Sequence, residues 1–312
     1  MNNHSYVVLG GTGFIGGHLL AALATTGCKV TVLSRNREQG RAINVLPNVR
    51  TYSTDVYDRT ALAKHLAGHD AVINLVGILN ETGGATFTHA HVDLTATVIA
   101  ACRQVGIRRI HQMSSLNAGE RASKYLKTRG EADSQVRNSG LDWTIYRPSV
   151  VYGDGDGLVF RFLKLLQMGP LLPLAQPHAK FAPAYVGDVA GAIKRCLTDR
   201  SSIGKVFELY GPDSMELIEI VRAIRDQAGL RRGVLPLPTA LGRLQALVAE
   251  LIPGKPFSLD NFNSLDVDSV GTRDGFASLG IVPRRFRAML PELLGHYSRE
   301  REFDIARATQ DS

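Results

Sequence analysis

Side chains that could act together on a carbonyl group lie near the middle of the chain. Ser114 and Ser115 lie at the end of the expected fifth strand, and Tyr125 and Arg129 follow on a helix-like stretch, four residues apart and so on one face. A phenol donates or accepts a proton, a nearby cation lowers its pKa and holds a ribose, and a hydroxyl orients the carbonyl oxygen. This combination predicts hydride transfer to or from a carbonyl. The alternative is that Tyr125 and Arg129 are surface residues of their helix.

A dinucleotide site is indicated at the start of the chain, where the apolar run Tyr6–Leu9 enters a glycine-rich turn. Gly10 permits the tight turn, Gly13 lets backbone N–H groups approach a pyrophosphate, and Gly16 lets the next helix pack against the strand. The helix N-terminus then points unpaired N–H groups at the phosphates. The alternative is an ordinary strand-to-helix turn. The cofactor-binding residues expected here are Gly10, Gly11, Thr12, Gly13, Phe14, Ile15 and Gly16.

The choice between the two nicotinamide cofactors depends on the end of the second apolar run. An NAD site usually has Asp or Glu about 20 residues after the glycine turn. Here the chain carries Ser34 and Arg35, followed by Arg37, and no acid. A guanidinium holds a 2′-phosphate that a carboxylate would repel. The cofactor expected is therefore NADP(H), with NAD(H) less favoured; the alternative is that both arginines are solvated.

Further cofactor contacts are expected where later strands end. Asp55 and Val56 follow the third strand, beside the expected adenine position, although Asp55 also suits a helix cap or a turn. Gly77 follows the fourth strand and would let the backbone approach the ribose. The remaining cofactor-binding candidates at strand ends are Leu75, Val76, Met113, Arg147, Pro148 and Val150.

Short apolar runs alternate with longer amphipathic ones, which is typical of a parallel sheet covered by helices. The expected fold is α/β, a doubly wound Rossmann sheet with a smaller mixed C-terminal lobe. We expect residues 1–150 to bind NAD(P) and residues 151–312 to form a substrate or partner lobe interleaved with them. The expected strands are 6–9, 29–33, 49–53, 71–76, 109–113 and 143–146, and the expected helices are 14–26, 36–45, 58–67, 86–105 and 122–139.

The second half is expected to contain helices at 158–167, 189–198 and 215–228, and a strand at 205–209. Ser214 or Asp213 is a plausible N-cap for the third of these helices. A further helix places the apolar side chains of residues 241–251 on one face. Packing into the core is its default interpretation. The second hypothesis is a membrane-surface or protein partner bound through residues 239–256.

The composition argues against a nucleic-acid-binding, disulfide-bonded, secreted or membrane-spanning protein. The 312 residues carry 36 basic and 29 acidic side chains, a formal charge of +7, without a run of like charges or a basic stripe typical of nucleic-acid binding. Cys28, Cys102 and Cys196 lack pairing or metal-ligand spacing, which suggests reduced buried thiols. With neither a signal peptide nor about 18 consecutive apolar residues, the chain is expected to be cytoplasmic, with peripheral binding to the inner face of a membrane as an alternative.

No metal site is expected. His89, His91 and His111 do not show the spacing of a zinc motif. The Gly-Asp-Gly-Asp-Gly run at residues 153–157 lacks the other ligands of a calcium loop, so we interpret it as a turn.

Together these motifs resemble the short-chain dehydrogenase/reductase superfamily, in its extended or atypical, epimerase/dehydratase-like form. The resemblance covers about residues 5–210 and includes Val186–Ala190, which is similar to the family's substrate-lobe segment. The narrower resemblance is to the NADPH-binding accessory subunit of respiratory complex I and its bacterial relatives. It is carried by Val76–Leu79, Phe87, His91-Val92 and residues 256–270.

One departure from the superfamily pattern affects the expected function. The family's catalytic pair is Tyr-xxx-Lys, and Arg129 stands at the position of the lysine. Arginine keeps the charge but is bulkier and does not titrate. The first hypothesis is an NADP(H)-dependent oxidoreductase acting on a carbonyl or hydroxyl compound, such as a sugar nucleotide or a quinone- or isoprenoid-like molecule. The alternatives are a non-catalytic NADPH-binding accessory protein of a membrane-associated respiratory or quinone-related complex, and a redox-sensing regulator.

Overall fold

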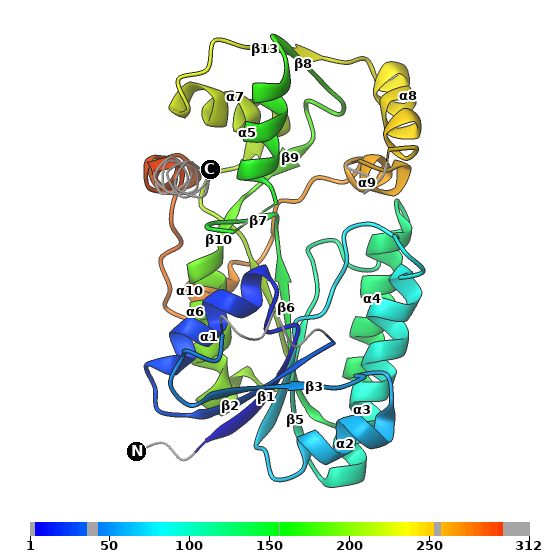
Figure 1. Cartoon of the computed structure of the whole chain (residues 1–312), viewed down its shortest axis with the longest axis vertical. Coiled ribbons are helices and arrows are strands. Elements are labelled where there is room, and N and C mark those ends of the chain that lie inside the picture. The colour runs from blue at the N-terminus through cyan, green and yellow to red at the C-terminus, as the bar shows by residue number, and fades with distance from the viewer. Residues whose placement is uncertain (1–3, 36–42, 156, 253–256, 296–312) are drawn as a thin grey trace, which may run out of the picture.

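The computed structural model describes residues 4–35, 43–155, 157–252 and 257–295, and a seven-stranded sheet lies at its centre (Figure 1). Its strand order is β11-β6-β5-β4-β1-β2-β3, and all neighbouring strands are parallel. This confirms the doubly wound fold expected from the sequence. The strands are β1 (Ser5–Leu9), β2 (Lys29–Ser34), β3 (Val49–Ser53), β4 (Ala71–Asn74), β5 (Arg109–Met113), β6 (Asp142–Pro148) and β11 (Lys205–Leu209).

Helices cover both faces of this sheet (Figure 1). One face packs against α1 (Phe14–Ala24), α6 (Val186–Thr198) and α10 (Gly275–Ser278). The other packs against α2 (Arg59–Leu66), α3 (Leu94–Val105) and α4 (Lys124–Arg137). Because successive side chains of a strand point to opposite faces, Val8 belongs to the first core and Val7 and Leu9 to the second.

Three expected elements differ from the structure in the first half. The helix expected at 86–105 begins as a π-helix, η1 (Thr88–Asp93), before continuing as α3. The helix expected at 36–45 falls mostly outside the described residues, and residues 43–45 form a turn. The fourth strand ends at Asn74, so that Leu75 and Val76 belong to the loop after it.

A smaller lobe lies at one end of the sheet (Figure 1) and has its own apolar core. The chain alternates between the two parts, because α6, β11 and α10 return to the main sheet after this lobe has begun. The elements outside the main sheet and its covering helices are β7 (Val151–Tyr152), α5 (Val159–Met168), β8 (Leu171–Leu174), β9 (Lys180–Phe181), β10 (Ala184–Tyr185), η2 (Arg200–Ser202), β12 (Met215–Glu216), α7 (Leu217–Gln227), β13 (Gly233–Pro236), α8 (Thr239–Ala249) and α9 (Leu259–Ser264).

The N-cap expected for α7 is wrong. Neither Ser214 nor Asp213 caps the helix, because Met215 and Glu216 pair with β9 as strand β12, and the helix begins only after them. The cap residue is Glu216, whose backbone N–H donates to Glu219 Oε2 at 2.8 Å.

The default interpretation of residues 241–251 is also wrong, because their apolar side chains do not enter the core. They are 45% to 84% exposed: Leu241, Leu244, Leu247, Val248 and Leu251. Helix α8 packs instead through Gly242 and Ala246, and a Cβ built on Gly242 would lie 3.0 Å from Ala175 Cβ. Among the described residues, no helix has the length and apolar composition needed to cross a membrane.

Candidate cofactor site

The glycine turn sits directly against the loop that follows β4. Gly10 has a φ of 76°, a conformation that favours glycine, and its carbonyl accepts a hydrogen bond from Gly13 N at 3.1 Å. A Cβ on Gly10 would lie 3.0 Å from Leu75 C and Val76 N. The turn therefore requires glycine both for its backbone angle and for its contact with the loop.

Helix α1 packs on the same turn without an intervening side chain. A Cβ on Gly16 would lie 2.4 Å from Gly10 O and 2.6 Å from Gly11 Cα. A Cβ on Gly11 would lie 2.8 Å from Val32 Cγ1 of the neighbouring strand. Ile15 contributes to the core beneath the helix.

The N-terminus of α1 suits an anionic group. Gly13 is its N-cap, without a capping side chain, and the first turn contains no acidic residue. A cavity of about 430 Å³ adjoins this end and is lined in part by Thr12, Gly13 and Phe14. Unpaired N–H groups and the positive end of the helix dipole favour phosphate at such a position. The far wall comes from the turn after β7, where Asp154 O accepts a hydrogen bond from His18 Nε2 at 2.9 Å.

The end of β2 presents one cation within the described residues. Ser34 is buried and Arg35 is exposed, while Arg37 lies outside the described residues. Burial raises the pKa of Tyr57, and the positive charge of Arg35 opposes that rise, so the two side chains lie near one another. Arg35 thus lies where the chain leaves the carboxyl edge of the sheet.

Asp55 and Val56 differ in their surroundings. The exposed Asp55 accepts a hydrogen bond from Tyr57 N at 2.9 Å, whereas Val56 is buried in the core behind the sheet. The Tyr57 ring stacks on His89, with ring centroids 3.9 Å apart and planes at 11°. Sequence reasoning missed this aromatic pair, because the two residues are far apart in the chain and no motif connects them.

Arg129 is buried at the carboxyl ends of β4 and β5, with 5% exposure. Its Nη1 donates to Met113 O at 3.0 Å and reaches Val76 O at 3.4 Å. A Cβ on Gly77 would lie 2.0 Å from Arg129 Nη2, so the guanidinium covers the bare backbone of Gly77. The sequence motif predicts that the Arg129 guanidinium lies beside the cofactor ribose. In the structure, this guanidinium binds backbone carbonyl groups of the protein itself.

Tyr125 stands in an aromatic cluster beside that guanidinium. Its ring meets those of Phe87 and His91 edge to face at 5.7 and 5.5 Å, and Arg129 Cζ lies 5.5 Å from its centroid. Burial and the neighbouring Arg129 lower the pKa of His91 to about 2, so His91 is neutral at physiological pH. Tyr125 and Arg129 do share one face of α4, as expected, and sequence reasoning missed the two rings that enclose Tyr125.

Several buried polar atoms in this cluster and just after β5 have no hydrogen-bond partner among the described residues. They include Ser115 Oγ, His91 Nε2 and Arg129 Nε. Ser114 is also buried, and it lies beside Asp133. Because buried polar groups in proteins are nearly always paired, these atoms indicate that a ligand or water completes this part of the site. The glycine cradle and these unpaired atoms both fit a bound dinucleotide.

The end of β6 contacts α4. Arg147 donates from Nε and Nη2 to Asp133 Oδ2 at 2.9 and 2.7 Å. Burial raises the pKa of Asp133, and the Arg147 guanidinium opposes that rise. Pro148 O accepts from Leu116 N, and Val150 O accepts from Ala184 N, both at 2.9 Å. These contacts show how the strand end is positioned, and its expected role in cofactor binding stays a prediction.

A segment from the C-terminal part of the chain holds the Tyr125 side of the site. Asp260 accepts hydrogen bonds from Lys124 N and Tyr125 N at 2.7 and 3.2 Å, at the start of α4. Asn261 Nδ2 donates to Leu79 O at 3.0 Å, which fixes the loop after Gly77. Sequence reasoning did not identify Asp260 as part of the site, because hydrogen bonds between distant segments leave no local pattern.

Within the described ranges, no group of three or more His, Cys, Asp or Glu side chains could hold a metal ion. Gly153, Asp154 and Gly155 belong to the turn that faces α1.

Comparisons with known proteins agree with this geometry. Residues 10–164 match a family model described as NAD(P)H-binding. The chain is 29% identical over 309 residues to the mitochondrial NADH dehydrogenase [ubiquinone] 1 alpha subcomplex subunit 9 of Arabidopsis thaliana, covering 93% of this chain and 77% of that protein. It is 27% identical to the ceramide reductase of Caulobacter vibrioides over 233 residues, covering 74% and 73%.

The fold also matches the crystal structure of an NADPH-dependent quinone oxidoreductase from Escherichia coli complexed with NADPH. The TM-score is 0.75 at 18% identity, and the match covers 94% of this chain and 99% of that one. The glycine turn, the parallel sheet and these similarities lead to one conclusion: residues 10–164 form an NAD(P)H-binding domain on a Rossmann-like sheet, and the chain is similar over most of its length to a subunit of mitochondrial NADH dehydrogenase.

Proposed function

We propose that this chain is an NADPH-binding accessory protein of a membrane-associated assembly, in which the nucleotide is a structural ligand. The observation that carries the proposal is the Arg129 guanidinium, buried over Gly77 and hydrogen-bonded to Met113 O. A nicotinamide ring supplies or accepts a hydride when it is bound. For that chemistry the Tyr125 phenol needs a neighbouring cation that is free to act on it. Here the cation is engaged by backbone carbonyls and does not titrate.

The glycine turn and the first turn of α1 would hold the pyrophosphate. Arg35, with no acidic residue beside it in the described part of β2, favours a 2′-phosphate. The stacked Tyr57 and His89 rings lie near Arg35 and would form the adenosine side of the site. The family model indicates binding of NAD(P)H, and these residues support a preference for NADPH.

The exposed face of α8 is the proposed contact with the assembly. Its leucines and Val248 form an apolar surface on a helix whose buried residues are the small Gly242 and Ala246. The similarity to a subunit of respiratory complex I supports a protein or membrane partner here. We infer that the protein binds peripherally at a membrane and that residues 239–252 make the contact. Leu244→Glu should release the protein from its assembly without changing NADPH affinity; Arg243→Glu, which alters charge rather than apolar area, is the matched control.

A second candidate function is an oxidoreductase acting on a carbonyl or hydroxyl compound. It is favoured by the buried Ser115 hydroxyl, which has no hydrogen-bond partner among the described residues, and by the similarity to ceramide reductase. In this alternative Ser115 would orient the substrate oxygen, and Tyr125 would transfer the proton. The substrate classes expected are sugar nucleotides and quinone- or isoprenoid-like molecules.

Two measurements separate the candidates. The first is titration with NADPH and NADH, together with analysis of nucleotide released from the purified protein by acid. We expect NADPH to bind more tightly, and preference for NADH would contradict the argument from Arg35. The second is single-turnover absorbance of bound NADPH with carbonyls and quinones. We expect no oxidation in the wild type or in Tyr125→Phe.

Arg129→Lys restores the residue types of the catalytic pair and is the sharpest variant. Under the accessory proposal, the wild type binds NADPH without oxidising it. Substrate-dependent oxidation by the wild type that disappears in Tyr125→Phe would overturn that proposal and establish the oxidoreductase. Oxidation that appears only in Arg129→Lys would show that the buried guanidinium is what prevents turnover.

A further inference from the structure

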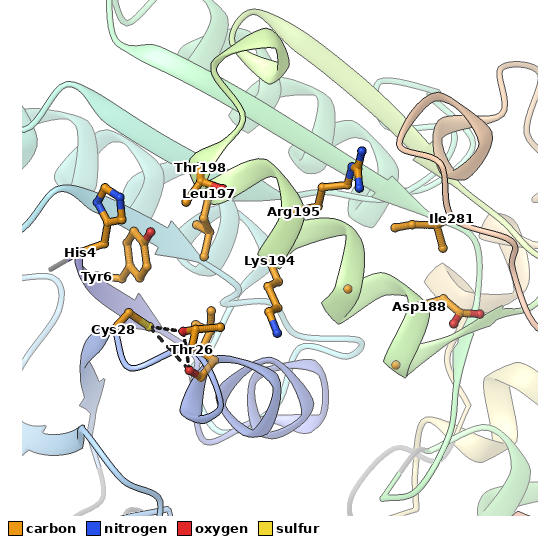
Figure 2. Close-up of a pocket in the computed structure, with 13 residues that line it drawn as sticks. His4, Tyr6, Thr26, Cys28, Asp188, Lys194, Arg195, Leu197, Thr198 and Ile281 are labelled. Atoms are coloured by element: carbon orange, nitrogen blue, oxygen red, sulfur yellow. Dashed lines mark hydrogen bonds between the residues drawn. The ribbon is translucent and has the colours of Figure 1, made fainter. Parts of the chain in front are cut away.

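A second cavity, of about 530 Å³, lies on the face of the sheet covered by α1 and α6 (Figure 2). It is bounded by Tyr6 at the start of β1, by the end of α1, and by α6. The glycine turn follows the other end of β1, so this cavity is separate from the cofactor cradle. Neither the proposed function nor the superfamily motifs use any of these side chains except Asp188, which belongs to the Val186–Ala190 segment.

The walls are mainly apolar. Leu23 comes from α1, Leu197 from α6, and Ile281 from the segment after α10. Gly191 leaves the α6 side open, because a Cβ built there would meet no atom within 4 Å. Such a wall fits a hydrocarbon chain, and it offers few hydrogen bonds to a sugar or a nucleotide.

Two cationic side chains of α6, Lys194 and Arg195, line this space and extend in different directions (Figure 2). Figure 2 shows the Lys194 side chain extending from α6 toward the turn that carries Thr26 and Cys28. Among the described residues, no hydrogen bond or ion pair engages the Lys194 ammonium. The cavity also contains Asp188, but its carboxylate accepts a hydrogen bond from Arg284 N at 2.7 Å and lies 3.7 Å from Arg284 Nη1. The unmatched charge in the cavity is therefore positive.

Tyr6 adds a hydrogen-bond donor to the same cavity. It is 3% exposed, and within the described part of the chain its hydroxyl has no partner. Burial raises the pKa of Tyr6 to about 12, so the hydroxyl is protonated at neutral pH. Together with Lys194 and Arg195, it gives a mainly apolar cavity a positive lining and one neutral donor.

We propose that this cavity binds a medium-chain carboxylate, with the carboxylate at Lys194 and the hydrocarbon chain against Leu23, Leu197 and Ile281. The Lys194 ammonium favours an anionic headgroup, and the apolar walls account for the rest of the ligand. A neutral lipid would leave Lys194 without a partner. The inference does not depend on the proposed function.

The test is calorimetric titration of the full chain, saturated with NADPH, with octanoate, decanoate and dodecanoate. Decanol and decylamine are the ligand controls, because they keep the chain and change the charge. We expect carboxylate binding that NADPH does not displace, and no comparable binding of either control. Equal binding of decanol or decylamine, displacement by NADPH, or no binding of any carboxylate would overturn the proposal.

Two variants locate the site. Lys194→Met should weaken decanoate binding about tenfold or more, because one charge-assisted hydrogen bond is lost. Gly191→Leu should fill the open side and remove binding. Lys64→Met is the matched control, since it removes one lysine charge from α2 on the opposite face of the sheet. Unchanged affinity in Lys194→Met, or an equal loss in Lys64→Met, would refute the assignment; thermal unfolding checks that each variant is folded.

Discussion

Replacing Gly16 by alanine tests the contact on which the cofactor cradle depends. The added Cβ would lie 2.4 Å from Gly10 O, where ordinary contacts begin near 3.4 Å. Helix α1 and the turn would therefore have to separate by about 1 Å, the difference between these two distances. Overpacking of this kind costs about 1–3 kcal/mol, and the better helix propensity of alanine returns about 1 kcal/mol. We expect a net loss of up to about 2 kcal/mol of unfolding free energy.

Gly16→Ala should also weaken the binding of NADPH. A shift of about 1 Å moves the N–H groups of the turn out of hydrogen-bonding range of a pyrophosphate. The expected loss is tenfold or more, which corresponds to about 1.4 kcal/mol. Urea unfolding gives the stability, and the fluorescence of NADPH on titration gives the affinity.

Gly17→Ala is the matched control for stability, because it lies one residue further along the same helix. A Cβ at Gly17 meets nothing within 4 Å, so alanine should stabilise the helix by up to about 1 kcal/mol. If Gly16→Ala behaved like Gly17→Ala and kept wild-type NADPH affinity, the close packing of α1 on the turn would have no part in binding.

Three further predictions concern the other side of the site. Burial lowers the pKa of His91 to about 2, so below pH 6.5 the unfolded chain takes up a proton that the native chain does not. This proton uptake lowers the free energy of unfolding by about 2 kcal/mol by pH 5. His91→Asn should therefore reduce the difference between the unfolding free energies measured in urea at pH 7 and at pH 5. An unchanged pH dependence would contradict it. Asp133→Ala leaves the Arg147 guanidinium without its carboxylate and should cost about 3 kcal/mol in urea unfolding, whereas wild-type stability would show the pair to be dispensable. Asp260→Ala should cost about 1 kcal/mol and speed amide hydrogen exchange at Tyr125, and unaltered exchange there would refute the assignment of this contact.

The parallel sheet and the glycine turn could be predicted because their signals are local. The buried strand β1 is a nearly continuous apolar run, and β1, β2, β3 and β5 lie within one residue of their expected bounds. The spacing of Gly10, Gly13 and Gly16 reflects backbone contacts within a few residues. Such patterns hold in any sequence that folds this way.

The direction of a long side chain could not be predicted. The spacing of Tyr125 and Arg129 correctly puts them on one face of α4, but it does not show that the guanidinium turns to Met113 O. Hydrophobic periodicity had a similar limit at α8. It identifies an apolar face, whereas the buried face is decided by the close approach that Gly242 and Ala246 allow.

The hydrogen bond between Asp260 and Tyr125 N has a consequence for the order in which the site forms. The two residues are 135 positions apart, whereas the turn that would hold the pyrophosphate closes within a few residues. Closing the longer loop costs more conformational entropy, and a chain made from its N-terminus completes the turn long before residue 260 exists. The turn that would hold the phosphates can thus form early, whereas the surroundings of Tyr125 are completed only after the segment that carries Asp260 has been made.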